Sequence, residues 1–86
     1  MKYRATPRFW QLYRALPAEV RELADANFSI LKGDSRHPSL KLKKIGKYWS
    51  VRVGLHYRAL AVESGVDLVR FWIGNHSEYD RLIGGR

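Results

Sequence analysis

A cluster of polar side chains follows the apolar segment FWIG (residues 71–74) near the end of the chain. The cluster consists of His76, Glu78, Tyr79 and Asp80. Histidine changes charge near neutral pH, so His76 is suited to giving a proton to a leaving alkoxide. Tyr79 would lie beside it on a helical turn, and Arg58, on a neighbouring strand, would stabilise charge on a pentavalent phosphorane. The pattern therefore indicates phosphodiester cleavage.

Each of these residues also has a structural explanation. A histidine after a strand is typical of a helix N-cap or a hydrogen-bonded surface residue, and Tyr79 fits a packing role. Arg58 has two candidate ion-pair partners, Glu63 and Asp80. Glu78 and Asp80 stand near a helix start, where they favour the helix dipole.

Metal or cofactor chemistry has little support. Neither a Ser-His-Asp order nor metal-ligand spacing is present, and the three histidines, at positions 37, 56 and 76, form no His-x-x-x-His pair. Without cysteine there is no thiolate site and no disulfide framework. We expect no metal and no small-molecule cofactor.

Length and composition fit one domain over residues 1–86. A hydrophobic content of 45%, with 13% aromatic residues, predicts a single modest core in these 86 residues. No run of about 18 apolar residues occurs, and the N-terminus, MKYRATPRFW, lacks the features of a secretory signal. The sequence thus predicts a soluble cytoplasmic protein with no membrane partner.

The charge balance is strongly basic, with 16 Lys and Arg against 8 Asp and Glu and a net charge of +8. Such a field attracts polyanions, although a merely solvated surface would have the same composition.

Two helices are predicted in the first third of the chain. Thr6 is a candidate N-cap, with Pro7 at the first helical position. Pro17 separates the helices, and Gly33 is expected to end the second in a left-handed conformation. The apolar stripes with helical spacing are Phe9, Leu12, Tyr13 and Leu16, then Val20, Leu23, Ala24, Phe28 and Leu31.

Beyond GDSRHP (residues 33–38) the apolar period changes from 3.6 to 2. Strands are predicted at about residues 40–43, 48–53, 57–63 and 68–74, with a short strand at 2–5 and a helix at 77–83. The last strand is almost wholly apolar and is expected inside the sheet. These elements predict an α+β fold in which a helical hairpin packs on a mainly antiparallel sheet of four to five strands, followed by a short C-terminal helix.

Alternation divides the sheet into two faces. The side chains expected against the helices are Leu40, Leu42, Trp49, Val51 and Val53. The opposite face would carry Lys41, Lys43 and Arg52, with Tyr48 between them. Positive charge beside an aromatic ring suits a phosphodiester backbone and a stacked base.

The stretches HPSLKLKKI, YWSVRVGLHYRAL and IGNHSEYD, in this order after two helices, resemble the RelE/ParE superfamily of toxins from type II toxin–antitoxin pairs. RelE-type members cut messenger RNA in the ribosomal A site, use the substrate's own 2′-hydroxyl as nucleophile and are silenced by a cognate antitoxin. The resemblance therefore implies an endoribonuclease that inhibits translation, with mRNA, the ribosome and an antitoxin as partners.

Residue roles follow from the resemblance. Arg58 matches the arginine that stabilises the scissile phosphate, His76 the general acid, and Tyr79 the C-terminal aromatic residue of the site. The residues expected to bind RNA, mainly from the basic face of the sheet, are Lys41, Lys43, Lys44, Tyr48, Arg52 and His56. The general base is open between His56 and Lys43.

The sequence departs from RelE at one strand. RelE has a lysine pair before its Tyr-Arg motif, whereas Trp49, Val51 and Val53 occupy most of that stretch here and only Arg52 is comparable in charge. ParE-like members share the fold, lack the nuclease residues and act on DNA gyrase. A gyrase inhibitor and a non-toxic nucleic-acid or partner-binding domain are therefore the alternatives.

Overall fold

The computed structural model describes residues 2–34 and 36–84, and the side chain of Ser39 is outside this description. The elements, in chain order, are β1 (Tyr3–Ala5), α1 (Pro7–Arg14), α2 (Ala18–Gly33), a 3-10 turn η1 (Pro38–Leu40), β2 (Lys43–Ile45), β3 (Tyr48–Val53), β4 (Tyr57–Ser64), β5 (Asp67–Asn75) and α3 (His76–Gly84).

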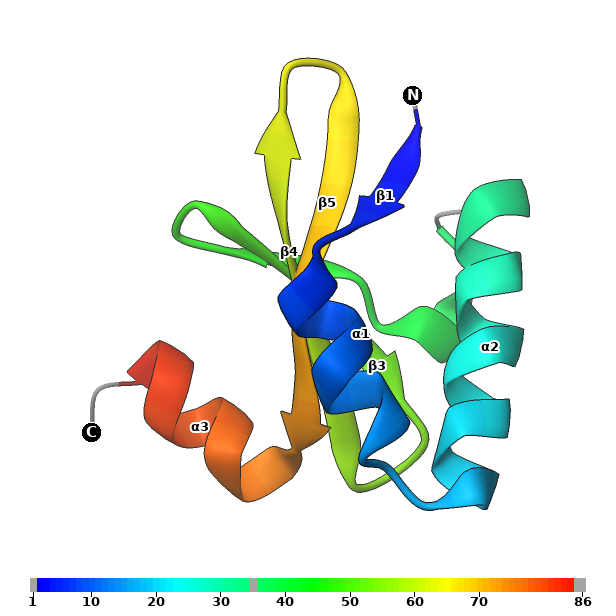
Figure 1. Cartoon of the computed structure of the whole chain (residues 1–86). Helices are drawn as coiled ribbons and strands as arrows, with labels where there is room; N and C mark the ends of the chain where they lie inside the picture. The colour runs from blue at the N-terminus through cyan, green and yellow to red at the C-terminus, as the bar shows by residue number, and fades with distance from the viewer. Residues whose placement is uncertain (1, 35, 85–86) are drawn as a thin grey trace.

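The five strands form one sheet in the order β1-β5-β4-β3-β2. Strands β2 to β5 are antiparallel neighbours, and β1 joins β5 in parallel. β5 therefore lies inside the sheet, as its apolar sequence predicts. Helices α1 and α2 lie apart from α3, which follows the end of β5 (Figure 1). The α+β architecture predicted from the sequence is confirmed.

The first helix begins as predicted, because the hydroxyl oxygen of Thr6 accepts a hydrogen bond from the backbone N–H of Phe9 (3.1 Å) and Pro7 occupies the first turn. The main core lies between the helical hairpin and one face of the sheet. Its buried members are Phe9, Val20, Ala24, Phe28, Leu31, Leu40, Val51, Val53, Ala59, Ala61, Leu68 and Ile73, with Leu42 and Trp49 partly buried against them. The predicted apolar face is confirmed.

A smaller buried layer lies on the opposite face of the sheet, under α3. Leu60 is 2% exposed but is not part of the main core, because it alternates with the core residues Ala59 and Ala61 along β4. Tyr79 of α3 is 4% exposed and bonds to Ser50 of this face. The helix α3 is therefore held by an anchor separate from the core.

One charged side chain is buried in the main core. Arg70 is 6% exposed, and its guanidinium carbon lies 4.1 Å from the ring centroid of Phe28 and 4.9 Å from that of Phe9. Burial lowers the pKa of Arg70. The aromatic faces compensate part of the lost hydration, since a desolvated cation–π contact contributes about 2 kcal/mol.

Three local predictions are wrong. Gly33 ends α2 without a left-handed conformation, and Asp34 follows it in an extended one. The strand predicted from Leu40 begins only at Lys43, because Pro38–Leu40 forms a 3-10 turn. Leu23 was predicted in the buried stripe of the second helix, but it lies beside that stripe and is 47% exposed.

Among the described helices, none has both the length and the apolar character needed to cross a membrane.

Candidate active site

A shallow groove of about 440 Å³ opens on the face of the sheet that carries α3. It is lined by Lys41, Leu42, Lys43, Ser50, Arg52 and Arg58. Strand pairing explains the arrangement, because Lys43 lies opposite Ser50, and Arg52 lies opposite Arg58. Paired residues share a face, so the cations gather on one side of the sheet. The spacing suits a phosphate-bearing chain.

Arg58 stands at the end of this groove. One of its guanidinium nitrogens donates a hydrogen bond to the carbonyl oxygen of Tyr57 (2.8 Å), and its carbon lies 6.0 Å from the ring centroid of Tyr79. In the part of the chain that the structure describes, no carboxylate forms an ion pair with Arg58. Its two candidate partners bind elsewhere, since Glu63 contacts Lys44 and Asp80 contacts His76. The Arg58 charge is therefore not neutralised by a direct ion pair.

His76 is the first residue of α3, and its side chain is 50% exposed. Its backbone N–H donates to the carbonyl oxygen of His56 (2.7 Å). Its Nδ1 lies 3.4 Å from a carboxylate oxygen of Asp80, which leaves Nε2 as the nitrogen available to a substrate. The helix is capped by Asn75, whose side-chain oxygen accepts a hydrogen bond from the N–H of Glu78 (2.9 Å). His76 is therefore not needed as the cap.

Tyr79 lies near both Arg58 and His76. Its ring centroid is 6.1 Å from the imidazole of His76, so these side chains lie beside each other as the helical spacing predicts. The phenol is buried and donates a hydrogen bond to the hydroxyl of Ser50 (2.8 Å). Because its polar atom is already bound, Tyr79 is placed to hold Arg58 and His76 in position.

Gly74 makes room for this arrangement. It lies opposite Arg58 in the pairing of β4 and β5. A Cβ atom at this position would come within 2.5 Å of the Trp72 ring and 3.1 Å of a Glu78 carboxylate oxygen. Glycine therefore allows the indole and the start of α3 to approach the backbone closely.

The predicted RNA-binding residues separate into two groups. Lys41, Lys43 and Arg52 line the groove. Lys44 faces the other side, with its ammonium 3.8 Å from Glu63, and the Tyr48 ring packs on Phe71 (5.2 Å). The side chain of His56 is exposed in the turn next to His76.

Ser50 and Leu42 line the groove without having been predicted there. Ser50 had a signal in the sequence, because its position between Trp49 and Val51 places it on the face of Arg52. No signal in the sequence pointed to Leu42, because an apolar residue in an alternating segment is expected to face the core.

Within residues 2–34 and 36–84, no group of three or more His, Cys, Asp or Glu side chains is arranged to hold a metal ion.

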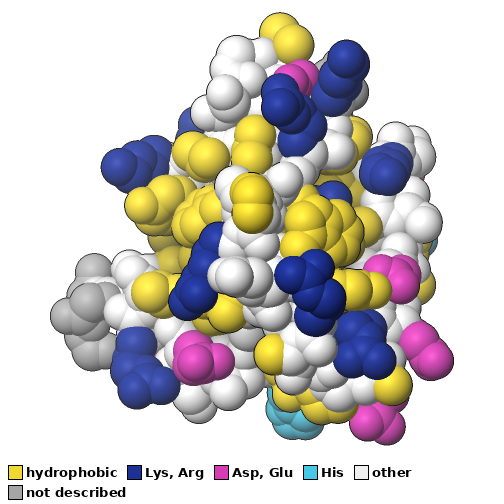
Figure 2. Space-filling model, viewed as in Figure 1, with side chains coloured by type: hydrophobic (Ala, Val, Ile, Leu, Met, Phe, Trp, Pro, Cys, Tyr) yellow, Lys and Arg dark blue, Asp and Glu magenta, His cyan; other side chains and the backbone are white. Residues whose placement is uncertain are grey.

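Positive charge is not confined to the groove. Lys and Arg side chains also surround an apolar area on the face seen in Figure 2, and acidic side chains are fewer there.

No protein-family model matches the sequence, and no curated protein matches it. Solved structures do match. The RelB-RelE antitoxin-toxin complex from Methanococcus jannaschii has a chain with a TM-score of 0.67 and 23% identity, over 90% of this chain and 95% of that one. The fold is that of RelE-like toxins.

Two further structures with the RelE-like fold agree. The YoeB/ParE toxin from Agrobacterium tumefaciens has a TM-score of 0.67 and 21% identity, over 88% of this chain and 99% of that one. YafQ from E. coli has a TM-score of 0.70 and 10% identity, over 91% and 96% of the two chains. At such identities the RelE-like likeness establishes the fold, and the activity has to be argued from the residues.

Proposed function

We propose that this chain, as one domain over residues 1–86, is the toxin of a type II toxin–antitoxin pair and cleaves messenger RNA on the ribosome. The observation that carries the proposal is that Tyr79 brings two groups together. The guanidinium carbon of Arg58, which lines the basic groove, lies 6.0 Å from the Tyr79 ring centroid, and the His76 imidazole lies 6.1 Å from the same ring. The RelE-like fold supports it, because a chain of the RelB-RelE antitoxin-toxin complex and the YoeB/ParE toxin share that fold. Ribosomes place such an activity in the cytoplasm.

The chemistry needs no metal ion. A base removes the proton of the 2′-hydroxyl, the 2′-oxygen attacks phosphorus, and the bond to the 5′-oxygen breaks. His76 gives the leaving 5′-oxygen a proton, and Arg58 stabilises the negative charge on the phosphorane. The products are a 2′,3′-cyclic phosphate and a 5′-hydroxyl. Tyr79 positions the acid and the arginine.

Two residues are candidates for the proton acceptor. Lys43 lines the groove, two strands away from Arg58, whereas His56 lies next to His76 in the turn before β4. An in-line displacement places acid and base on opposite sides of the phosphate, which favours Lys43. Lys43→Ala is then expected to lower the cleavage rate by more than His56→Ala does.

The antitoxin partner is proposed from the RelE-like complex that contains RelB. A flexible acidic segment would be attracted by the net charge of +8. Absence of a complex with the product of the neighbouring reading frame would count against the pair.

The test is induced expression of the wild type and His76→Ala, with growth and transcript 5′ ends followed together. We expect arrest with cuts in translated messages, and a loss of at least about 100-fold in cleavage for His76→Ala. Ser77→Ala, at the next and likewise exposed position of α3, is the matched control and should cut normally.

Each alternative function predicts another outcome. A gyrase inhibitor is favoured by the apolar Trp49, Val51 and Val53 in place of a lysine pair. It would cause arrest with a DNA damage response and intact messages, unaffected by His76→Ala. A non-toxic binding domain would cause no arrest in any variant.

A further inference from the structure

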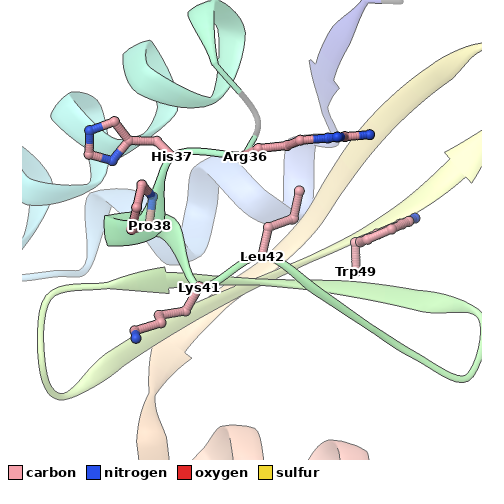
Figure 3. A pocket seen from close by; sticks show the side chains of 6 residues that line it. All are labelled: Arg36, His37, Pro38, Lys41, Leu42 and Trp49. Carbon is pink, nitrogen blue, oxygen red and sulfur yellow. The ribbon is translucent and has the colours of Figure 1, made fainter.

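A second cavity of about 600 Å³ lies beside the groove. It is lined by Arg36, His37, Pro38, Lys41, Leu42 and Trp49 (Figure 3). Lys41 and Leu42 line both hollows, so the cavity meets the groove just before β2, at the edge of the sheet, although Trp49 belongs to the face opposite the groove. Its volume is in the range of small-ligand sites.

Trp49 supplies an aromatic surface whose polar atom is already used. The indole Nε1–H donates to a carboxylate oxygen of Glu63 (2.7 Å), and the ammonium of Lys44 lies 5.7 Å from the ring centroid. These contacts fix the orientation of the ring, and the core supports it from below. The part of the indole ring that borders the cavity is therefore the surface on which a ligand would stack.

Two cations border the cavity. Arg36 and Lys41 are exposed, and within the described part of the chain neither forms an ion pair with a carboxylate. Arg36 extends to the same side of Leu42 as Trp49, whereas Lys41 points to the other side (Figure 3). The aromatic face and a free guanidinium thus share one half of the cavity.

The junction with the groove has an unusual backbone. Lys41 has φ of 48°, and it is the one non-glycine residue in ranges 2–34 and 36–84 with a positive φ. This conformation costs about 1–2 kcal/mol for an L-residue. Strain of this kind gathers at functional sites, and here it sets the direction of the lysine between the two hollows.

We propose that the cavity is a subsite for a nucleotide flanking the cleaved position of single-stranded RNA. The base stacks on Trp49, its phosphate pairs with Arg36, and the strand passes Lys41 into the groove. The inference rests on the proposed function and extends its substrate to a segment longer than the groove alone holds.

The observations favour a nucleotide over an acidic peptide. Every base has a face that stacks on an indole, and every nucleotide carries the phosphate that a guanidinium binds. A peptide carboxylate would use Arg36 but would have no general use for the half-buried indole ring that borders the cavity. The cations also continue as Lys43, Arg52 and Arg58 in the groove, which matches the regular charge of a nucleic acid strand.

The test uses the purified full-length chain and 2′-O-methyl RNA, which binds but cannot be cleaved because its nucleophile is blocked. The two probes are a trinucleotide and an oligonucleotide of about seven residues. Fluorescence anisotropy should give about tenfold tighter binding of the longer RNA to the wild type. Trp49→Leu and Arg36→Gln should each remove most of this difference, and Trp49→Phe should keep it.

Salt dependence separates the two contacts. Arg36→Gln should lower the slope of log K against log salt by about 0.7 for the longer RNA, since one phosphate contact is lost. Trp49→Leu should leave the slope unchanged. Arg8→Gln, which removes an exposed arginine of α1 that lines neither hollow, is the matched control and should behave as the wild type apart from non-specific attraction.

Equal affinity of the wild type for both RNAs, including no measurable binding of either, would overturn the subsite. His76-dependent cleavage would then still report on the proposed function by itself. If Trp49→Leu instead abolishes binding of the neighbouring reading frame's product while the RNA affinities stay equal, the cavity is a protein-binding site and the proposal is wrong.

Discussion

The Tyr79 phenol is the contact through which one side chain ties α3 to the sheet. Its hydrogen bond to Ser50 is buried, and Ser50 also lines the groove. Removing one partner leaves the other polar group buried without a bond, whereas removing both does not. The pair is therefore expected to act as a unit.

A double-mutant cycle tests this. Tyr79→Phe and Ser50→Ala should each lower the free energy of unfolding by about 1–2 kcal/mol. The double variant should lose less than the sum, with a coupling energy of about 1 kcal/mol from urea unfolding. Additive losses would mean that the hydrogen bond contributes nothing to holding α3.

At the residue level, the sequence predicts which site residues lie close together better than it predicts which groups they bond to. The helical spacing of His76 and Tyr79 and the adjacency of their strand to that of Arg58 are properties of the backbone, so their proximity was predictable. The partner of the Tyr79 hydroxyl depends on the register of β3, which the alternating pattern alone does not fix. No pattern in the sequence predicts that Arg70 is buried among aromatic rings, because arginine is rarely buried.

A side-chain hydrogen bond joins the two helices of the hairpin. The Tyr13 hydroxyl of α1 donates to a carboxylate oxygen of Asp25 in α2 (2.7 Å). This hydrogen bond, together with burial and the negative charge of Asp25, raises the pKa of Tyr13. A raised pKa means that the folded state favours the protonated phenol.

The sign of the pH effect follows. The contribution of this contact is fully present below the unfolded-state pKa of tyrosine, about 10, and is lost as pH rises through the higher folded value. Urea unfolding above about pH 10 should show a steeper fall in stability for the wild type than for Tyr13→Phe. The difference at neutral pH should stay below about 1 kcal/mol because the contact is exposed. Parallel curves would rule out the contact in solution.

At the level of elements, the periodic segments were predictable and the connection before β2 was not. The strands from Tyr48 to Asn75 and the three helices lie close to the predicted ranges, with alternation in β3 and apolar stripes in α1 and α2. The segment at Leu40 to Lys43 alternates like a strand, yet Leu40 is required in the core from a 3-10 turn and Lys41 takes a left-handed conformation. Tertiary packing overrides the local pattern there.

For the whole molecule, repulsion among basic groups should limit stability. The net charge is +8. Each of the three described ion pairs has at least one well-exposed partner, so screening of these pairs by salt lowers stability only slightly. We therefore expect Tm to rise by about 4 °C between low salt and about 0.3 M NaCl.

Heparin should stabilise the protein at low salt by binding the folded state, and this effect should vanish at high salt. A sulfated disaccharide is the matched control, because it carries the same sulfate groups as heparin but far fewer of them per molecule. A Tm that falls as salt is added would show that attractive pairs outweigh repulsion.

The parallel pairing of β1 with β5 sets the order in which the chain can fold during its synthesis. β1 leaves the ribosome before β5 and has to wait for this strand, which begins at Asp67. The backbone N–H of Lys2 bonds to the side chain of Asp67 across 65 positions. Contacts of such separation form late. His76 and Tyr79 follow β5, so Arg58, Tyr79 and His76 cannot come together before α3 has been synthesised. Under the proposed function, a chain that stops before α3 should therefore not cleave RNA.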